Sequence, residues 1–366
     1  MFVPISNTPR DYAWGSTTAI PELFGVAPDG RPQAELWLGT HPGSPALTAD
    51  GAPLAEVAGT LPFLLKVLAA ASPLSLQAHP TPEQAAAGYD REDAAGVPLD
   101  APERNYKDRG HKPELIVALS ERFRALCGFR PTSQTRLTLE GVPGAESLRE
   151  RLDSDDALRD VVEWLISRGA GVDELVAAVS AHSGDGLEWE TVRLLAETYP
   201  GDPGIVISLL LHTVELRAGE ALYLPAGNIH AYLEGLGIEL MAASDNVLRG
   251  GQTPKHIDVP ELLSVLDFTP ILEPRLAPET VAPGVVAFRP DVPDFELLIA
   301  DGGATATPAG AAIVLVLDAP LVIRSADDAV EVPVGGAVYL PEGGGPLSFE
   351  GSGRAFVATT SLTTRP

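Results

Sequence analysis

Imidazole, amide and carboxylate side chains occur at strand-like spacing in three segments of this chain. Gln77 and His79 lie two residues apart in SLQAHP, and side chains two apart on a strand project from the same face. Glu114 lies in the apolar run HKPELIVAL, and His230 follows a Gly/Pro turn in LPAGNIH. Together these residues offer two nitrogen and two oxygen donors, a set that suits Zn²⁺, Fe²⁺ or Mn²⁺.

Each of these residues also has a simpler interpretation. A histidine beside a proline is more often a hydrogen-bonded loop residue than a ligand, and a glutamine in a strand usually bonds a neighbouring carbonyl. His182 falls in a predicted helix and His212 follows an apolar run, so we expect both to pack or to lie at the surface. Lys112 should share a strand face with Glu114, whereas His111 should point the other way.

A Gly-rich segment further along the chain carries charges of both signs. In GIELMAASDNVLRGGQTPKHID, the residues Asp245, Asn246, Arg249 and Lys255 crowd around two glycines and a proline. Arg and Lys hold phosphate, while carboxylates hold hydroxyl groups or move protons. The segment therefore fits an anionic, hydroxylated ligand, and it fits a solvated loop with internal salt bridges equally well.

The elements that must position these residues are mostly short strands. Gly and Pro number 36 and 34 and separate short apolar runs, a pattern typical of a sandwich or barrel. Residues 145–202 differ, because apolar residues recur there at helical spacing. We therefore predict a mainly β fold with an inserted α-helical domain at 145–202. The predicted β parts are 1–144 and 203–267, which form one barrel, and 268–366, which forms a second.

A weak internal repeat supports two β units. GEALYLPAGNIH, which begins at Gly219, and GGAVYLPEGGGP, which begins at Gly335, share the spacing of Gly and Pro. The first copy ends on His230, whereas the second has Pro346 at that position. The first copy matches the second motif of the cupin jelly roll, in which a turn between two strands sets an imidazole inside the barrel. This pattern predicts one metal-binding cupin jelly roll and one degenerate C-terminal jelly roll.

Composition excludes several classes of protein. The chain has 366 residues, with 50 Asp and Glu against 25 Lys and Arg, and a formal net charge of -25. So few cations argue against a nucleic-acid or anionic-membrane protein. The single cysteine, Cys127, cannot form an internal disulfide, and the N-terminus does not read as a signal peptide. We expect a soluble cytoplasmic protein.

The chain resembles the type I mannose-6-phosphate isomerases (phosphomannose isomerases) along most of its length. The segments that carry the resemblance are YAWGS at 12–16, AELWLGTHP at 34–42, LPFLLKVLAAASPLSLQAHP at 61–80, YKDRGHKPELIVAL at 106–119, ALCGFRP at 125–131, YLPAGNIHAYLEG at 223–235 and GIELMAASDNVLRGGQTPKHIDVPEL at 237–262. All four lysines of the chain lie inside these segments. From about residue 270 the resemblance is limited to general β character.

The resemblance implies a zinc-dependent aldose-ketose isomerase of the cupin superfamily, with one zinc ion per chain, that interconverts mannose 6-phosphate and fructose 6-phosphate. It further implies a monomer and a role in mannose and nucleotide-sugar precursor metabolism. The implied zinc ligands are Gln77, His79, Glu114 and His230. The implied catalytic residues are Arg249, Lys112 and Asp245, and the implied substrate-binding residues are Lys255, Glu239, Tyr232 and Ser75.

The mechanism that we expect is proton transfer between C1 and C2 through a cis-enediol. Lys112 is the leading candidate for the base, because a nearby cation and partial burial favour its neutral amine. Asp245 and Glu239 are the alternatives. Arg249 would stabilise the enediolate or bind phosphate, and Lys255 would bind phosphate. Two other functions stay open at this stage: a cupin oxygenase that uses Fe²⁺, and a non-catalytic sugar-phosphate sensor.

Overall fold

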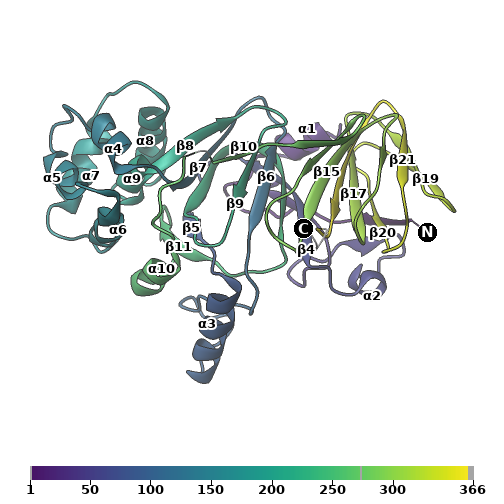
Figure 1. Cartoon of the computed structure of the whole chain (residues 1–366), viewed down its shortest axis with the longest axis horizontal. Helices are drawn as coiled ribbons and strands as arrows, with labels where there is room; N and C mark the ends of the chain where they lie inside the picture. Colours follow the sequence, from purple (N-terminus) through teal and green to yellow (C-terminus); the bar gives the residue numbers. More distant parts are fainter. Residues whose placement is uncertain (1, 273, 362–366) are drawn as a thin grey trace.

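Helices and sheets follow one another along the long axis of the molecule, with a group of helices at one end and the C-terminal strands at the other (Figure 1). This computed structural model describes residues 2–272 and 274–361. Its strands pair in antiparallel ladders. Within the described residues, no helix combines the length and the apolar character needed to cross a membrane.

The first β unit is a barrel-like arrangement of ten strands. Its strands are β2 (Glu35–Leu38), β4 (Phe63–Ala70), β5 (Leu76–Ala78), β6 (Glu114–Ala118), β7 (Phe123–Phe129), β8 (Leu211–Leu216), β9 (Ala221–Leu224), β10 (His230–Ala242), β11 (Leu248–Gly251) and β12 (Arg275–Leu276).

Strand β10 joins the two halves of this unit. Its first residues pair with β5 and β7, and its later residues pair with β4 and β6. The change of partners occurs at Gly235, whose φ is +128°. A Cβ at this glycine would lie 2.8 Å from the Cα of Phe123, so only glycine allows the two strands to approach so closely. The bend sets the two halves of the unit face to face.

The second β unit is a sandwich of an eight-stranded and a four-stranded sheet. Its strands are β1 (Val3–Ser6), β3 (Leu47–Thr48), β13 (Glu279–Ala282), β14 (Val285–Phe288), β15 (Glu296–Asp301), β16 (Thr305–Ala306), β17 (Ala312–Leu317), β18 (Leu321–Arg324), β19 (Ala329–Val332), β20 (Ala337–Leu340), β21 (Leu347–Gly351) and β22 (Arg354–Thr359). One apolar core fills the space between its two sheets.

The helices form a cap on the outer face of the first β unit. The helices of this cap are α4 (Thr132–Thr138), α5 (Glu146–Arg151), η1 (Asp155–Ala157), α6 (Leu158–Ile166), α7 (Val172–Ala181), α8 (Leu187–Thr198), α9 (Gly204–Ile207) and η2 (Ser208–Leu210). Their apolar faces share a core with the outward side chains of β5, β7, β10 and β11. Helices outside the cap are α1 (Ala19–Leu23), α2 (Ala55–Ala58), α3 (Pro82–Ala94), which projects from the barrel in Figure 1, and α10 (Val259–Val265).

Strand β4 shows how the layers are packed. All eight of its residues are buried. Outward residues such as Leu65 and Val67 pack against the eight-stranded sheet of the second unit. The inward residue Leu68 joins the core of the first barrel. A strand covered on both faces reads as an almost continuous apolar run, and Lys66 is the one charged residue in FLLKVLAA.

The mainly β architecture with an inserted helical segment confirms the fold predicted from the sequence. The helices of the cap begin before residue 145 and end after residue 202. Three strands also cross the predicted domain limits. Strand β1, near the N-terminus, pairs with β20 of the second unit, and β3 pairs with β1 in the same sheet. Strand β12, beyond residue 268, pairs with β9 of the first unit. The two β units therefore exchange short strands.

Candidate metal centre

Three buried side chains converge inside the first β unit. The ligand atoms of His79, Glu114 and His230 all lie within 4.8 Å of one another. The Nε2 atoms of the two histidines lie 3.2 Å from the two carboxylate oxygens of Glu114, one to each oxygen. Each side chain is at least 98% buried. Glu114 is the first residue of β6 on one half of the unit. On the other half, His79 directly follows β5 and His230 begins β10.

Hydrogen bonds orient both imidazoles toward the shared space. The Nδ1 atom of His79 lies 2.7 Å from the carbonyl oxygen of Asn246, and that of His230 lies 3.0 Å from the carbonyl oxygen of Asn228. Because a carbonyl oxygen can only accept, each Nδ1 carries the hydrogen and each Nε2 presents a lone pair. Within the described part of the chain, neither Nε2 atom has a hydrogen-bond partner.

The electrostatics of this cluster suit a bound cation. Burial and the ammonium of Lys112 lower the pKa of His79 to about 4, so its imidazole is neutral near pH 7. Burial opposes ionisation of Glu114, but Lys112 and His79 hold the pKa of that carboxyl well below its usual range. A neutral His79 imidazole and an ionised Glu114 are the protonation states in which these groups bind a divalent metal ion.

Gln77 lies beside the cluster. In the antiparallel pairing of β5 with β10 its partner is His230, and in the pairing of β5 with β11 its partner is Arg249. Cross-strand partners project from the same face of a sheet. The four residues predicted as ligands thus lie in one region of the barrel. One amide, two imidazoles and one carboxylate fit zinc, which accepts nitrogen and oxygen donors in sites of low coordination number.

Lys112 and His111 lie as their spacing predicts. The Nζ atom of Lys112 is 2.7 Å from Oε1 of Glu114, on the side of the cleft. His111 faces the second β unit, with Nε2 at 2.8 Å from Oδ2 of Asp294.

A cleft of about 440 Å³ opens above the cluster. All seven residues predicted for catalysis and substrate binding line this cleft: Arg249, Lys112, Asp245, Lys255, Glu239, Tyr232 and Ser75. Gln77 and Glu114 also line it, whereas both histidines are fully buried behind its wall. The cleft therefore gives a small molecule access to one side of the candidate metal centre.

One end of the cleft is positive although the whole chain is strongly acidic. Arg249 and Lys255 both line this end. Burial lowers the pKa of Arg249, and the positive charge of Arg249, with burial, lowers the pKa of Lys255. Two cations held close together without full solvation favour an anionic ligand such as a phosphate group.

A buried ion cluster in the cleft wall centres on Lys66, a residue that we did not predict as part of the site. The Nζ atom of Lys66 lies 2.9 Å from Glu239, 3.4 Å from Glu35 and 4.9 Å from the ring centroid of Trp37. Burial opposes a charged amine, but Glu239 and Glu35 raise the pKa of Lys66. Burial also raises the pKa of Glu239. The signal that could have identified this cluster is the single lysine in the apolar run FLLKVLAA.

Two further wall residues extend this polar surface. His41, which the sequence did not place at the site, has Nε2 at 3.4 Å from Oδ2 of Asp245, and burial lowers its pKa. The hydroxyl of Tyr232 has no hydrogen-bond partner among the described residues, and burial raises its pKa well above its usual value.

Gln252 lies near the positive end, next to the helical cap. Its φ of +56° is unusual for a residue with a side chain, and its N–H donates to Oδ2 of Asp202 at 3.0 Å. Both amide atoms of its side chain are buried and lack a hydrogen-bond partner within the described residues.

Comparison with known proteins agrees with this geometry. The family model for the catalytic domain of type I phosphomannose isomerase matches residues 2–132. Over 379 residues the chain is 38% identical to mannose-6-phosphate isomerase from Salmonella typhimurium, covering 95% of this chain and 97% of that protein. The enzyme of the same name from Homo sapiens is 33% identical over 355 residues, or 81% of each chain.

Solved structures of mannose 6-phosphate isomerase are also similar to this chain. A crystal structure of mannose 6-phosphate isomerase bound with zinc and yttrium matches with a TM-score of 0.90 at 35% identity, covering 99% of this chain and all of that one. The zinc-bound holo form of mannose 6-phosphate isomerase also matches with a TM-score of 0.90. The match extends through both β units and the helical cap, and it confirms the cupin jelly-roll fold expected from the sequence. The chain therefore belongs to the type I mannose-6-phosphate isomerase family and is an isomerase.

Proposed function

We propose that this chain interconverts D-mannose 6-phosphate and D-fructose 6-phosphate in a zinc-dependent reaction that proceeds by proton transfer through a cis-enediol. The observation that carries the proposal is the buried His79–Glu114–His230 cluster at the base of a cleft whose far end holds Arg249 and Lys255. This arrangement offers a metal to the sugar carbons and two cations to the phosphate of one small substrate. Its place would be in mannose and nucleotide-sugar precursor metabolism.

Gln77, His79, Glu114 and His230 would hold the zinc ion. When bound, zinc supplies Lewis-acid polarisation of a substrate oxygen. Three of the four proposed ligands are neutral, so the set carries only the single negative charge of Glu114. The carbonyl groups that accept from the two Nδ1 atoms would keep both imidazoles aimed at the same point.

Arg249 and Lys255 would bind the phosphate group and so fix the direction in which the sugar enters. An arginine can make two parallel charge-assisted hydrogen bonds to phosphate, whereas a lysine acts as a compact point charge. Arg249 is more deeply placed than Lys255, which is exposed. Arg249 is therefore the residue that would also reach charge developing on the sugar.

Lys112 would move the proton between C1 and C2. Its side chain lines the cleft, and its Nζ atom lies next to Glu114. Acting as the base, this amine would take the proton from one carbon and return it to the neighbouring carbon, so one base serves both halves of the reaction. Asp245 and Glu239 are the alternative bases, because their carboxylates line the same cleft. Tyr232, Ser75 and Glu239 would bind sugar hydroxyl groups.

The proposed function is tested by a coupled assay for fructose 6-phosphate. We expect turnover of mannose 6-phosphate by the purified protein, loss of turnover after dialysis against a chelator, and recovery when zinc is restored. Absence of turnover with a full complement of zinc would contradict the proposal.

The proton-transfer route is tested by running the reaction in D₂O. An enediol exposes the migrating proton to exchange at the base, so we expect deuterium at C1 or C2 of the product. Replacement of the base should lower kcat by about 10²- to 10⁴-fold. Lys112→Ala with near wild-type kcat would exclude Lys112 as the base, and Asp245→Asn would then be compared in the same assay.

A further inference from the structure

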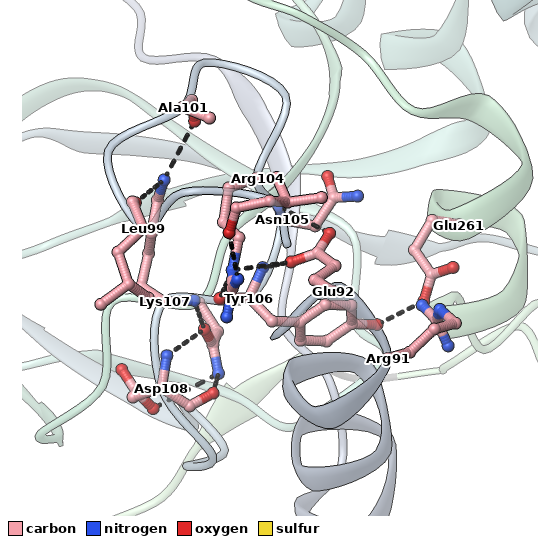
Figure 2. Close-up of polar contacts among 12 residues, drawn as sticks. Arg91, Glu92, Leu99, Ala101, Arg104, Asn105, Tyr106, Lys107, Asp108 and Glu261 are labelled. Carbon is pink, nitrogen blue, oxygen red and sulfur yellow. Dashed lines mark hydrogen bonds and ion pairs between the residues drawn. The ribbon is translucent and has the colours of Figure 1, made fainter. Parts of the chain in front are cut away.

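The loop that carries Lys112 has no regular secondary structure to hold it in place. It spans residues 95–113, between α3 and β6. Its middle is fastened to α3, because the carboxylate of Glu92 accepts the N–H groups of Asn105 and Tyr106 at 3.0 and 2.9 Å (Figure 2). These contacts lie several residues before Lys112. The last part of the loop therefore needs a second anchor close to the site.

Asn246 provides that anchor with all the hydrogen-bonding capacity of its amide. Its Oδ1 accepts the N–H groups of Lys107 and Asp108 at 2.6 and 3.2 Å. Its Nδ2 donates to the carbonyl oxygens of Asp108 and Gly110 at 2.9 and 2.8 Å, and it also lies 3.3 Å from Oδ1 of Asp108. These contacts use both lone pairs of Oδ1 and both hydrogens of Nδ2, which is the full capacity of an asparagine amide. The side chain is fully buried, so water does not compete for these bonds.

The backbone of the same residue contacts the metal centre. The carbonyl oxygen of Asn246 accepts the Nδ1–H of His79 at 2.7 Å. Its neighbour Asp245 lines the cleft and donates its own N–H to Oδ2 of Asp108 at 2.9 Å. One short segment thus bonds to a candidate zinc ligand on one side and to the loop of Lys112 on the other.

We propose that Asn246 is a positioning residue that fixes the Lys112 loop relative to His79, and so sets the distance between the proton-transferring amine and the metal. The proposal rests on the proposed zinc-dependent isomerase function. The anchors to α3 hold the same loop, as Figure 2 shows for Glu92, Asn105 and Tyr106, but their contacts do not include a candidate ligand. Asn246 therefore differs from these anchors, because it connects the loop to a candidate ligand and does not only fasten the loop.

The direct test is Asn246→Ala, which removes all of these side-chain bonds and keeps the carbonyl that accepts from His79. Loss of a group that orients ligands or reactants typically costs 10- to 100-fold in metal affinity or activity. We expect kcat to fall by about 10- to 100-fold with KM changed by less than about threefold, because the phosphate-binding cations are untouched. We also expect faster release of zinc to a colorimetric chelator.

Asn105→Ala is the matched control, because it removes an amide from the same loop whose Nδ2 donates to Asp258 rather than to the site. It should leave kcat and zinc release at wild-type values. Asn246→Asp is the second variant in case Asn246→Ala does not fold, since it has nearly the same shape and keeps the bonds accepted by Oδ1. It should lower kcat and speed zinc release in the same direction.

A double-mutant cycle with Lys112→Ala distinguishes positioning from simple loss of structure. If Asn246 acts through Lys112, Asn246→Ala should lower kcat much less in the Lys112→Ala background than in the wild type. The proposal would be overturned if Asn246→Ala lowered kcat by the same factor in the Lys112→Ala background as in the wild type. Wild-type kinetics in Asn246→Ala, or the same defect in Asn105→Ala, would also overturn it. A wild-type protein without turnover would refute the proposed function instead. The zinc-release comparison would then still decide whether Asn246 orders the metal centre.

Discussion

Replacing Lys66 by methionine removes a buried cation and leaves two buried carboxylates behind. Its Nζ atom lies between Glu239 and Glu35, and the three side chains are each less than a tenth exposed. Removing one partner of a buried ion pair costs about 3–5 kcal/mol, because the remaining charge stays desolvated without its counter-ion. Methionine keeps most of the apolar stem of lysine. We therefore expect the free energy of unfolding to fall by about 3–5 kcal/mol.

The assay is urea denaturation of chelator-treated protein at about pH 8 and about pH 5. Burial raises the pKa of Glu239 in the folded state. A carboxyl with a raised pKa destabilises the folded state more as pH rises through that value, so the loss in Lys66→Met should be larger at pH 8 than at pH 5. Lys107→Met is the matched control. The Nζ atom of Lys107 donates to the carbonyl oxygens of Leu99 and Ala101, and its loss should cost about 1 kcal/mol.

A second substitution sharpens the test. Glu239→Gln should destabilise the wild type, because it removes a partner of Lys66. In the Lys66→Met background the same change should stabilise the protein, because it removes a buried charge without a counter-ion. A loss no larger than that of Lys107→Met, a loss independent of pH, or destabilisation by Glu239→Gln in both backgrounds would refute this reasoning.

Three further predictions concern the site and its surroundings. In metal-free protein the pKa of His79 is about 4 when folded and about 6.5 when unfolded. Only the unfolded state gains a proton between these values, so the free energy of unfolding should fall by about 3 kcal/mol from about pH 7 to about pH 4, and His79→Gln should flatten that decline in urea titrations. Gln252→Leu should raise the free energy of unfolding by about 1–3 kcal/mol, because it removes buried amide atoms without partners among the described residues; a lower urea midpoint would contradict this. Arg249→Met should lower kcat/KM for mannose 6-phosphate by about 10- to 150-fold with an unchanged circular dichroism spectrum, and wild-type kinetics would remove Arg249 from the site.

The spacing of residues on strands was enough to predict several local relations. Gln77 lies on β5 and His79 directly follows it, and the alternation of side chains in extended chain predicts that they share a side. Lys112 lies just before β6 and meets Glu114, two residues on, as the same spacing predicts. The Gly/Pro turn before His230 predicted an imidazole inside the barrel, and this imidazole is fully buried there. Such relations depend only on neighbouring residues and on the period of a strand.

Long-range strand pairing could not be predicted in the same way. Lys66 meets Glu239 and Glu35 because β4 pairs with β10 on one side and with β2 on the other, and these strands are far apart in the sequence. No local pattern indicates that β1 pairs with β20. Helix α4, which precedes the predicted helical insertion, could not be recognised from its sequence. TSQTRLT has one large apolar residue, Leu137, which is 70% exposed, so the segment shows no helical periodicity of apolar residues.

The central claim is that Glu114 and the two histidines hold the metal ion on which isomerisation depends. The most direct measurement is the zinc content of wild-type protein and of Glu114→Gln, taken together with turnover of mannose 6-phosphate in the same samples. Glu234→Gln is the matched control, because Glu234 lies on β10 and pairs with Arg124 instead of the cluster. We predict one zinc ion per chain and turnover in the wild type and the control, and loss of both in Glu114→Gln. Full zinc content and turnover in Glu114→Gln would contradict the account.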